Sequence, residues 1–284
     1  MKLLFLFIDG VGVREPAFDN PVNSEVCPHL CRLIARYSKS IDACLGIGGL
    51  PQSATGQATI FTSKNCAEAM GKHCEGFPGP ALRNIIEADN IFLQLKKRGK
   101  RVCFADAYLI DSPDELKLQR FKSASTVMAL TTPEVIRTAE DLYNNEAVMQ
   151  DITRETIQDR YADIPVISPQ SAAEHLCRLA QANDFTFFEF FQTDVSGHSM
   201  DYERACAVLR IYDRFLATVC RLAETSGITI VITSDHGNIE NMSERGHTFN
   251  KVPFISIGPG AASLREGVES LVDVAGSFLR AMGG

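Results

Sequence analysis

Five short runs of apolar residues recur along the chain and are typical of strands buried on both faces of a sheet. These runs are Lys2–Ile8, Arg101–Ala105, Phe185–Gln192, Ile228–Thr233 and Val252–Ile257. Between them, apolar residues recur at helical spacing, most clearly from Asp201 to about Thr225, and Gly227 follows the end of that pattern. The alternation predicts an α/β fold in which helices flank a mostly parallel sheet.

Capping sequences predict where further helices begin. Pro28 opens a helix over Cys27–Tyr37, and Ser168-Pro169 opens another. Thr131 to Glu134, with a proline in the run, is expected to start a helix over Val135–Tyr143.

The segment from residue 108 to residue 165 departs from this pattern. Its charges are frequent, its apolar periodicity is weak, and it contains no long β-like run. We expect it to form a small inserted cap, with a solvated face over Asn144–Arg160. Residues 1–107 and 166–284 then form the α/β core.

Composition narrows the class of protein. Of 284 residues, 45% are hydrophobic and 22% are charged, as in ordinary globular proteins. The formal charge of -7 argues against nucleic acid as a partner, because such binding relies on basic side chains. No run approaches the roughly 18 apolar residues that span a bilayer, so no membrane association is expected. The 9 cysteines include no Cys-x-x-Cys pair, which favours reduced thiols and a soluble, cytoplasmic protein.

Carboxylates and imidazoles follow or precede the predicted strands at the edge where parallel α/β sheets bind ligands. They are Asp9, Asp194, His198, Asp235, His236 and His247. Any one of the aspartates alone is as well explained by a helix cap, and any one histidine by a structural role. Together they form an oxygen and nitrogen ligand set that suits Zn²⁺ or Mn²⁺, with Mg²⁺ as an alternative, and that is too large for one tetrahedral ion. We therefore expect two divalent metal ions.

A hydroxyl nucleophile is available near this edge. The glycine-rich loop at 46–49 leads into Gln52-Ser53-Ala54-Thr55-Gly56-Gln57, where a helix is expected to begin. Backbone N–H groups at a helix start favour an anion, and a metal ion can activate a hydroxyl without a separate base. Two metal ions roughly 3.5–4 Å apart suit in-line phosphoryl transfer. An ordinary capped helix is the alternative.

Five segments together resemble the alkaline phosphatase superfamily, namely FIDGVG (7–12), QSATGQ (52–57), TDVSGH (193–198), SDHGNIE (234–240) and GHTFNKVPF (246–254). More narrowly, they are similar to the metalloenzyme core shared by cofactor-independent phosphoglycerate mutase and phosphopentomutase. The resemblance implies an alkaline-phosphatase-like core with two metal ions. One ion would be held by Asp9, Ser53, Asp235 and His236, and the other by Asp194, His198 and His247. It also implies that Ser53 becomes transiently phosphorylated, with Thr55 as the alternative position.

The substrate is less defined than the metal ligands. Gln57 stands where the phosphoglycerate mutases have a histidine, and residues 108–165 are shorter than their phosphate-recognising domain, which argues against phosphoglycerate. The candidate residues for binding a substrate phosphate are Arg14, Lys72, His73 and Arg83, with Lys64, Arg120 and Lys122 as further candidates. A solvated surface charge or a capping role is the alternative for each of them.

The sequence thus predicts a two-metal phosphoryl-transfer enzyme that acts on a small phosphorylated metabolite through a Ser53 phosphoenzyme. Both a phosphomutase and a phosphomonoesterase fit this prediction. A phosphodiesterase, or a hydrolase of phosphonate or sulfate esters on the same core, is an alternative. A non-catalytic metal-binding protein is a further one.

Overall fold

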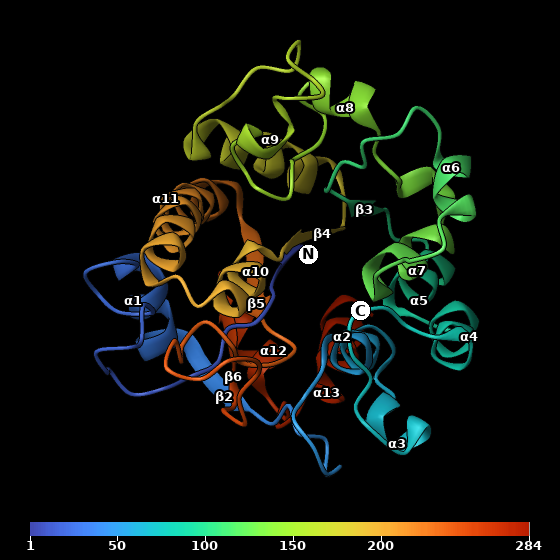
Figure 1. The fold of residues 1–284 in the computed structure, drawn as a ribbon. Coiled ribbons are helices and arrows are strands. Elements are labelled where there is room, and N and C mark those ends of the chain that lie inside the picture. The colour runs from blue at the N-terminus through green and yellow to red at the C-terminus, as the bar shows by residue number, and fades with distance from the viewer. Residues whose placement is uncertain (284) are drawn as a thin grey trace.

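A six-stranded sheet forms the centre of the computed structural model, which describes residues 1–283 (Figure 1). The strands, in the spatial order β2-β6-β5-β1-β4-β3, are β1 (Lys2–Ile8), β2 (Ser38–Ile41), β3 (Val102–Phe104), β4 (Phe185–Phe190), β5 (Ile228–Thr233) and β6 (Val252–Ile257). Strands β3, β4, β1 and β5 are parallel, whereas β6 is antiparallel to both β5 and β2. The predicted α/β class with a mostly parallel sheet is confirmed. Position 284, the last of the expected core, lies outside the described residues.

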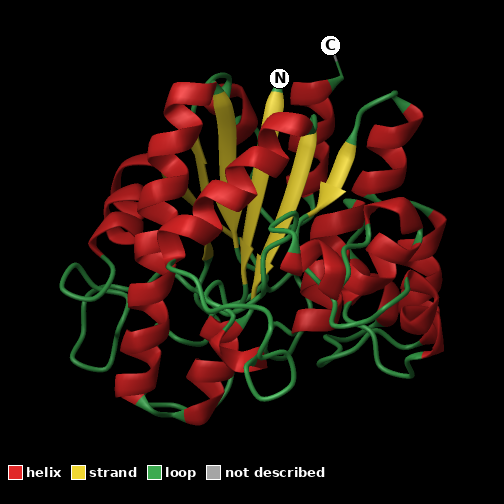
Figure 2. Cartoon of the chain, turned by 90° about the horizontal axis from the view of Figure 1, so that it is seen from above, coloured by secondary structure: helices red, strands yellow, loops and turns green. Residues whose placement is uncertain are grey.

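Helices cover both faces of the sheet, as Figure 2 shows. They are α1 (Pro28–Tyr37), α2 (Ser53–Thr62), α3 (Cys66–Met70), α4 (Pro80–Ala88), α5 (Ile91–Lys97), α6 (Pro113–Leu118), α7 (Ala124–Leu130), α8 (Ala139–Tyr143), α9 (Pro169–Ala182), α10 (Gln192–Ser199), α11 (Tyr202–Ser226), α12 (Ala261–Arg265) and α13 (Asp273–Met282). Short 3-10 turns lie at Pro133–Val135 and Glu155–Ile157. Within residues 1–283, no helix combines the length and the apolar character needed to cross a membrane.

The five predicted strands all occur, with two differences in extent. Strand β3 is shorter than expected at both ends, and β4 ends at Phe190 because the chain turns into α10 at Gln192. Strand β2 was not predicted. It pairs only with β6 at the edge of the sheet, and its sequence SKSI lacks the apolar run of a strand buried on both faces.

The prediction of one helix over Val135–Tyr143 was wrong. The backbone is extended at Ile136, and the carbonyl of Arg137 accepts a hydrogen bond from the N–H of Tyr108 at 2.9 Å. The helix begins only at Ala139, because the backbone N–H of Thr138 donates to Asp141 Oδ2 at 2.7 Å in a capping box. The N-cap of this helix, Thr138, therefore lies several residues after the start signal expected at Thr131 to Glu134.

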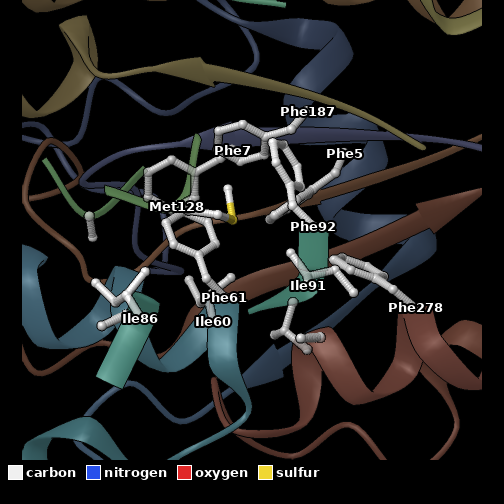
Figure 3. Close-up of a cluster of buried hydrophobic side chains, with 14 of the residues drawn as sticks. Phe5, Phe7, Ile60, Phe61, Ile86, Ile91, Phe92, Met128, Phe187 and Phe278 are labelled. Atoms are coloured by element: carbon white, nitrogen blue, oxygen red, sulfur yellow. The ribbon is translucent and has the colours of Figure 1, made fainter. Parts of the chain in front are cut away.

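Successive side chains of β1 point to opposite faces of the sheet, and each face has its own apolar core. Phe5 and Phe7 lie in a cluster with α2 and α5, whereas Leu4 and Leu6 lie in a cluster with α9 and α11. In the first cluster, Phe61 of α2 meets Phe187 edge-on at a centroid distance of 5.5 Å (Figure 3). This packing holds α2 against the sheet. The first residue of the helix then lies at the edge formed by the carboxyl ends of the parallel strands.

Residues 108–165 divide among three clusters of apolar side chains, and Val148 and Ile152 belong to the cluster with α9 and α11. Leu116 of α6 and Met128 of α7 pack into the main core, whereas Leu142, Met149 and Ile164 belong to a small separate cluster. The expected solvated face over 144–160 was wrong, because Val148 is hydrogen-bonded to Ala105 beside β3 and Arg154 is fully buried. Whether the segment acts as a cap stays a prediction.

Candidate metal centre

The sheet topology explains why residues far apart in the chain meet at one edge. Asp9 directly follows β1, and Asp235 and His236 follow β5. Helix α10 begins just after β4 and carries Asp194 and His198. Because β6 runs antiparallel to β5, its start lies at the same edge, and the loop before it brings in His247.

One group, here called the inner cluster, consists of Asp9, Ser53, Asp235 and His236. His236 Nε2 lies 3.4 Å from Asp9 Oδ1 and 3.4 Å from Asp235 Oδ2. Ser53 Oγ lies 2.9 Å from the same nitrogen. The side chains of Asp9, Asp235 and His236 are exposed by 8%, 0% and 0%, so these three are shielded from solvent, whereas Ser53 is half-buried.

The other group, the outer cluster, consists of Asp194, His198 and His247. The Nε2 atoms of the two histidines are 3.2 Å apart, and they lie 3.3 and 3.6 Å from the carboxylate oxygens of Asp194. The clusters adjoin, because the His247 ring stacks on His236 with centroids 3.6 Å apart. The ligand atoms of Asp9, Asp194 and His236 also lie within 4.8 Å of one another, so Asp194 stands between the two groups.

The inner cluster holds carboxylates whose charge is poorly compensated. Burial, reinforced by the neighbouring carboxylates, raises the pKa of Asp9 well above its usual value, and burial with the charge of Asp194 raises the pKa of Asp235 to about 8. Among the described residues, both carboxylate oxygens of Asp235 and one of Asp9 lack a hydrogen-bond partner. A divalent cation would supply the missing positive charge, so the donor set fits a metal ion.

The protonation of His236 agrees with that fit. Burial, and to a smaller extent the neighbouring His247, lowers the pKa of His236 to about 3. Its imidazole is therefore neutral at physiological pH, which is the form that binds metal ions.

The outer cluster is electrostatically different. Burial acts to raise the pKa of Asp194, but the hydrogen bond from His198 and the charge that His236 carries below its own pKa of about 3 outweigh it and lower the pKa to about 2. The same hydrogen bond raises the pKa of His198. His198 is 47% exposed, so the outer cluster meets solvent.

Neighbouring polar groups orient the candidate ligands. Gln57 Nε2 donates to Asp9 Oδ2 at 3.1 Å, and Asn238 Nδ2 donates to Asp194 Oδ1 at 2.6 Å. His247 Nδ1 donates to the carbonyl of Pro51 at 2.7 Å, which leaves Nε2 facing the site. Asn238 was not predicted as a site residue, although it belongs to the SDHGNIE segment.

Two glycines allow the ligand elements to approach closely. A Cβ at Gly56 of α2 would lie 2.9 Å from the Cβ of Asp235, and a Cβ at Gly197 of α10 would lie 2.5 Å from Asn238 Oδ1. Neither distance is compatible with ordinary van der Waals contact. These glycines therefore set how near α2 and α10 come to the loop after β5.

The two candidate nucleophiles on α2 have different surroundings. Ser53 is the first residue of the helix and its hydroxyl lies in the inner cluster. Thr55 is fully buried, and its hydroxyl donates to the carbonyl of Gln52 at 3.2 Å and accepts from the N–H of Cys74 at 3.2 Å. Thr55 thus ties the helix start to a neighbouring loop, which leaves Ser53 as the hydroxyl that faces the candidate ligands.

The predicted substrate-binding arginines are engaged elsewhere. Arg14 donates to Asp19 Oδ2 at 3.1 Å and to the carbonyl of Glu240 at 3.0 Å. Arg83 donates to the carbonyls of Pro78 and Arg120 at 2.8 and 2.9 Å. These bonds hold loops together and do not bring either guanidinium into the two clusters.

The other predicted phosphate-binding residues also lie outside the clusters. His73 Nε2 is 3.1 Å from the carbonyl of Cys44. Lys64 and Lys72 are exposed. In residues 108–165, the Arg120 guanidinium lies over the Phe121 ring, and Lys122 donates to the carbonyl of Lys117 at 3.1 Å.

A buried acidic pair beside the inner cluster was not predicted. Glu189 Oε2 accepts from the Ser125 hydroxyl at 2.5 Å, and the Glu189 N–H donates to Asp106 Oδ2 at 2.9 Å. Burial raises the pKa of Glu189 to about 7 and that of Asp106 well above its usual value. The sequence feature that could have identified Glu189 is its position as the single charged residue in the apolar run FTFFEFF.

Comparison with known proteins gives matches in both sequence and fold. A family model described as the Metalloenzyme superfamily matches residues 1–283. The 2,3-bisphosphoglycerate-independent phosphoglycerate mutase of Wolinella succinogenes is 34% identical over 122 residues, which are 41% of this chain and 24% of that protein. That of Methylobacillus flagellatus is 32% identical over 112 residues, 37% of this chain and 22% of that protein. The chain thus spans about a quarter of the length of the curated relatives it matches.

Solved structures share the fold over nearly the whole chain. The alkaline phosphatase of the Antarctic bacterium TAB5 superimposes with a TM-score of 0.60 at 11% identity, covering 99% of this chain and 98% of that chain. The phosphoglycerate mutase of Leishmania mexicana, at low cobalt concentration, gives a TM-score of 0.54 at 10% identity, covering 99% and 95%. The family match and the shared fold confirm the resemblance found in the sequence.

Proposed function

The chain belongs to the Metalloenzyme superfamily, and from that premise we propose that it is a metal-dependent phosphoryl-transfer enzyme for a small phosphorylated compound. The observation that carries the proposal is the position of Ser53, whose Oγ lies 2.9 Å from His236 Nε2 inside a cluster of buried carboxylates. The mutases among its relatives and the phosphatases that share its fold support the same reaction class.

We assign the metal ions to the two clusters. Asp9, Ser53, Asp235 and His236 would hold one ion, and Asp194, His198 and His247 would hold the other. When bound, Mn²⁺ or Zn²⁺, or alternatively Mg²⁺, would neutralise charge on the phosphoryl group and lower the pKa of the nearby hydroxyl.

Ser53 acts as the nucleophile in this proposal. It loses its hydroxyl proton to solvent, and its Oγ forms a bond to phosphorus while the bond between phosphorus and the ester oxygen breaks. The departing oxygen keeps the electron pair and takes a proton from water. The N-terminus of α2 favours the negative charge of the phosphorylated side chain, because its first backbone N–H groups face that end of the helix.

The phosphoryl group then passes from Ser53 to an acceptor. Transfer to water makes the enzyme a phosphomonoesterase, and transfer to another hydroxyl of the substrate makes it a phosphomutase. The 47% exposure of His198 favours water as the acceptor, because solvent reaches the outer cluster directly.

Turnover measurements on the reconstituted protein test this proposal. The protein is loaded separately with Mn²⁺ and Zn²⁺ and assayed on a phosphate monoester, a phosphate diester and a sulfate ester. We expect metal-dependent monoester hydrolysis that Ser53→Ala abolishes while metal content is largely retained. A preference for the diester or the sulfate would move the assignment to another class of ester hydrolase.

Thr55→Ala is the matched control for the nucleophile. It removes a hydroxyl of the same helix that binds Gln52 and Cys74 and lies outside both clusters. We expect it to lower stability while retaining turnover. Full activity in Ser53→Ala together with loss of activity in Thr55→Ala would transfer the nucleophilic role to Thr55.

A further inference from the structure

A cavity lies at the opposite end of the sheet from the metal centre. Its volume is about 720 Å³, within the range of small-molecule sites, and it is lined by residues of α1, α11, β5, β6 and α12. Ile228, the first residue of β5, lines it, whereas Asp235 follows the end of that strand. In Figure 1, α1 and α11 lie side by side next to this part of the sheet.

Positively charged side chains dominate the polar lining. Arg32, Arg221 and Arg265 line the cavity, with Glu224 as its single acidic residue. Within residues 1–283, none of these arginines takes part in an ion pair. In a chain with a formal charge of -7, three guanidinium groups without a carboxylate partner around one cavity leave it electropositive.

His29 also lines the cavity and contacts one of its arginines. Its Nδ1 lies 2.5 Å from Arg32 Nη2, and because a guanidinium only donates, Nδ1 accepts and Nε2 carries the proton. Nε2 is buried and has no partner among the described residues. The His29 ring therefore helps to hold the Arg32 guanidinium at the cavity, while its own Nε2 is not exposed to that space.

The rest of the lining is apolar and firmly held. Leu33, Ile228 and Ile230 form apolar wall, and each is at most 4% exposed. Gly258, with a φ of +100°, packs so closely on β5 that a Cβ there would lie 2.8 Å from the carbonyl oxygen of Ile228. Arg265 Nη1 donates to Ser256 Oγ at 2.8 Å, which orients that guanidinium in advance. Arg265 and the apolar wall are therefore in place before any ligand binds, whereas Arg32 and Arg221 are exposed side chains at the cavity.

We propose that this cavity is a binding site for a small organic anion, a carboxylate or phosphate ester with an apolar body. The arginines would hold the acidic group, because guanidinium groups match the geometry of carboxylate and phosphate oxygens. The wall formed by Leu33, Ile228 and Ile230 would hold the apolar part. The site is separate from the metal centre and does not rest on the proposed function.

Calorimetric titration with 2-naphthoate tests the proposal, with uncharged 2-naphthalenemethanol as the matched probe. We expect naphthoate to bind one site per chain and the alcohol to bind at least about tenfold more weakly. Arg32→Ala and Arg221→Ala should each weaken naphthoate binding about tenfold, as expected for the loss of one charge-assisted hydrogen bond. Ala217→Trp, which fills the cavity from α11, should abolish binding.

Two control variants locate the binding. Arg36→Ala removes an exposed cation of α1 that does not line the cavity and should leave the affinity unchanged. His247→Ala alters the metal centre and should also leave it unchanged. Absence of binding, equal affinity in the arginine variants and the unaltered protein, or loss of binding in His247→Ala would each overturn the proposal.

Discussion

The inner and outer clusters use the same residue types in opposite electrostatic settings. In the inner cluster, buried Asp9 and Asp235 have raised pKa values and oxygens without partners. In the outer cluster, the pKa of Asp194 is lowered to about 2 by its hydrogen bond with a half-exposed His198, against the effect of burial. The inner group needs an added cation, whereas the carboxylate of the outer group is already stabilised by hydrogen bonds from His198 and Asn238.

This difference indicates that the two clusters tolerate change unequally. Removing a ligand from the inner cluster leaves the negative charge of the buried carboxylates even less compensated, because water cannot take the place of the removed side chain. Removing a ligand from the outer cluster opens a position that solvent can fill. The predictions below test that contrast.

The largest effect is expected for His236→Ala. This variant removes an imidazole that lies within 3.4 Å of Ser53 Oγ and of both inner carboxylates, so we expect turnover to fall about 10³-fold or more and one metal ion per chain to be lost. Metal analysis together with turnover under saturating Mn²⁺ or Zn²⁺ measures both. Retention of two ions would remove His236 from the ligand set.

A smaller, reversible effect is expected for His198→Ala. Because the outer cluster is open to solvent, water should take the vacant position, and metal affinity should fall roughly 10–100-fold. Turnover should then recover at high metal concentration, unlike that of His236→Ala. A loss of turnover that excess metal does not restore would erase the predicted contrast.

Gly56→Ala tests the close packing behind the inner cluster. Alanine normally favours a helix interior over glycine by about 0.8–1 kcal/mol, but here the new Cβ would lie 2.9 Å from the Cβ of Asp235. We therefore expect displacement of Asp235 and about a tenfold loss of metal affinity, measured by competition with a chelator. Gly48→Ala, where no atom lies within 4 Å of the added Cβ, is the control and should change nothing.

The mildest effect concerns Glu189, which lies beside the inner cluster and outside both ligand sets. Its pKa is raised by burial from 4.5 to about 7, so between these values the folded state keeps a proton that the unfolded state has lost. The free energy of unfolding therefore falls as pH rises through this window.

Glu189→Gln has no titrating carboxyl group at this position. Between pH 4.5 and 7, its free energy of unfolding should therefore fall less than that of the unaltered protein, and the difference should be on the order of 2 kcal/mol. Denaturant unfolding of the metal-free protein at several pH values measures the difference. Glu174→Gln, a change at an exposed position of α9, is the control. Identical pH slopes in Glu189→Gln and the unaltered protein would contradict the prediction.

The sequence predicted most of the sheet because its strands are buried on both faces and therefore form continuous apolar runs. Strand β2 escaped prediction because an edge strand with the sequence SKSI needs no such run. Helix α10 was missed for a related reason, since QTDVSGHS carries candidate ligands in place of an apolar stripe.

Convergence of Asp9, Asp194, His198, Asp235 and His236 was predictable because each follows the end of a strand at one edge of the sheet. His247 joins them only because β6 runs antiparallel to β5, which the sequence does not specify. The partners of Arg14 and Arg83 were also beyond prediction, because both pair with backbone carbonyls, which leave no pattern in a sequence.

Anomalous diffraction from crystals of the Mn²⁺-loaded protein tests the central claim most directly. We predict two peaks per chain, one bounded by Asp9, Ser53, Asp235 and His236 and the other by Asp194, His198 and His247. Their separation should be roughly 3.5–4 Å, as in two-metal phosphoryl-transfer sites. A single peak, or peaks away from these side chains, would contradict the two-metal assignment.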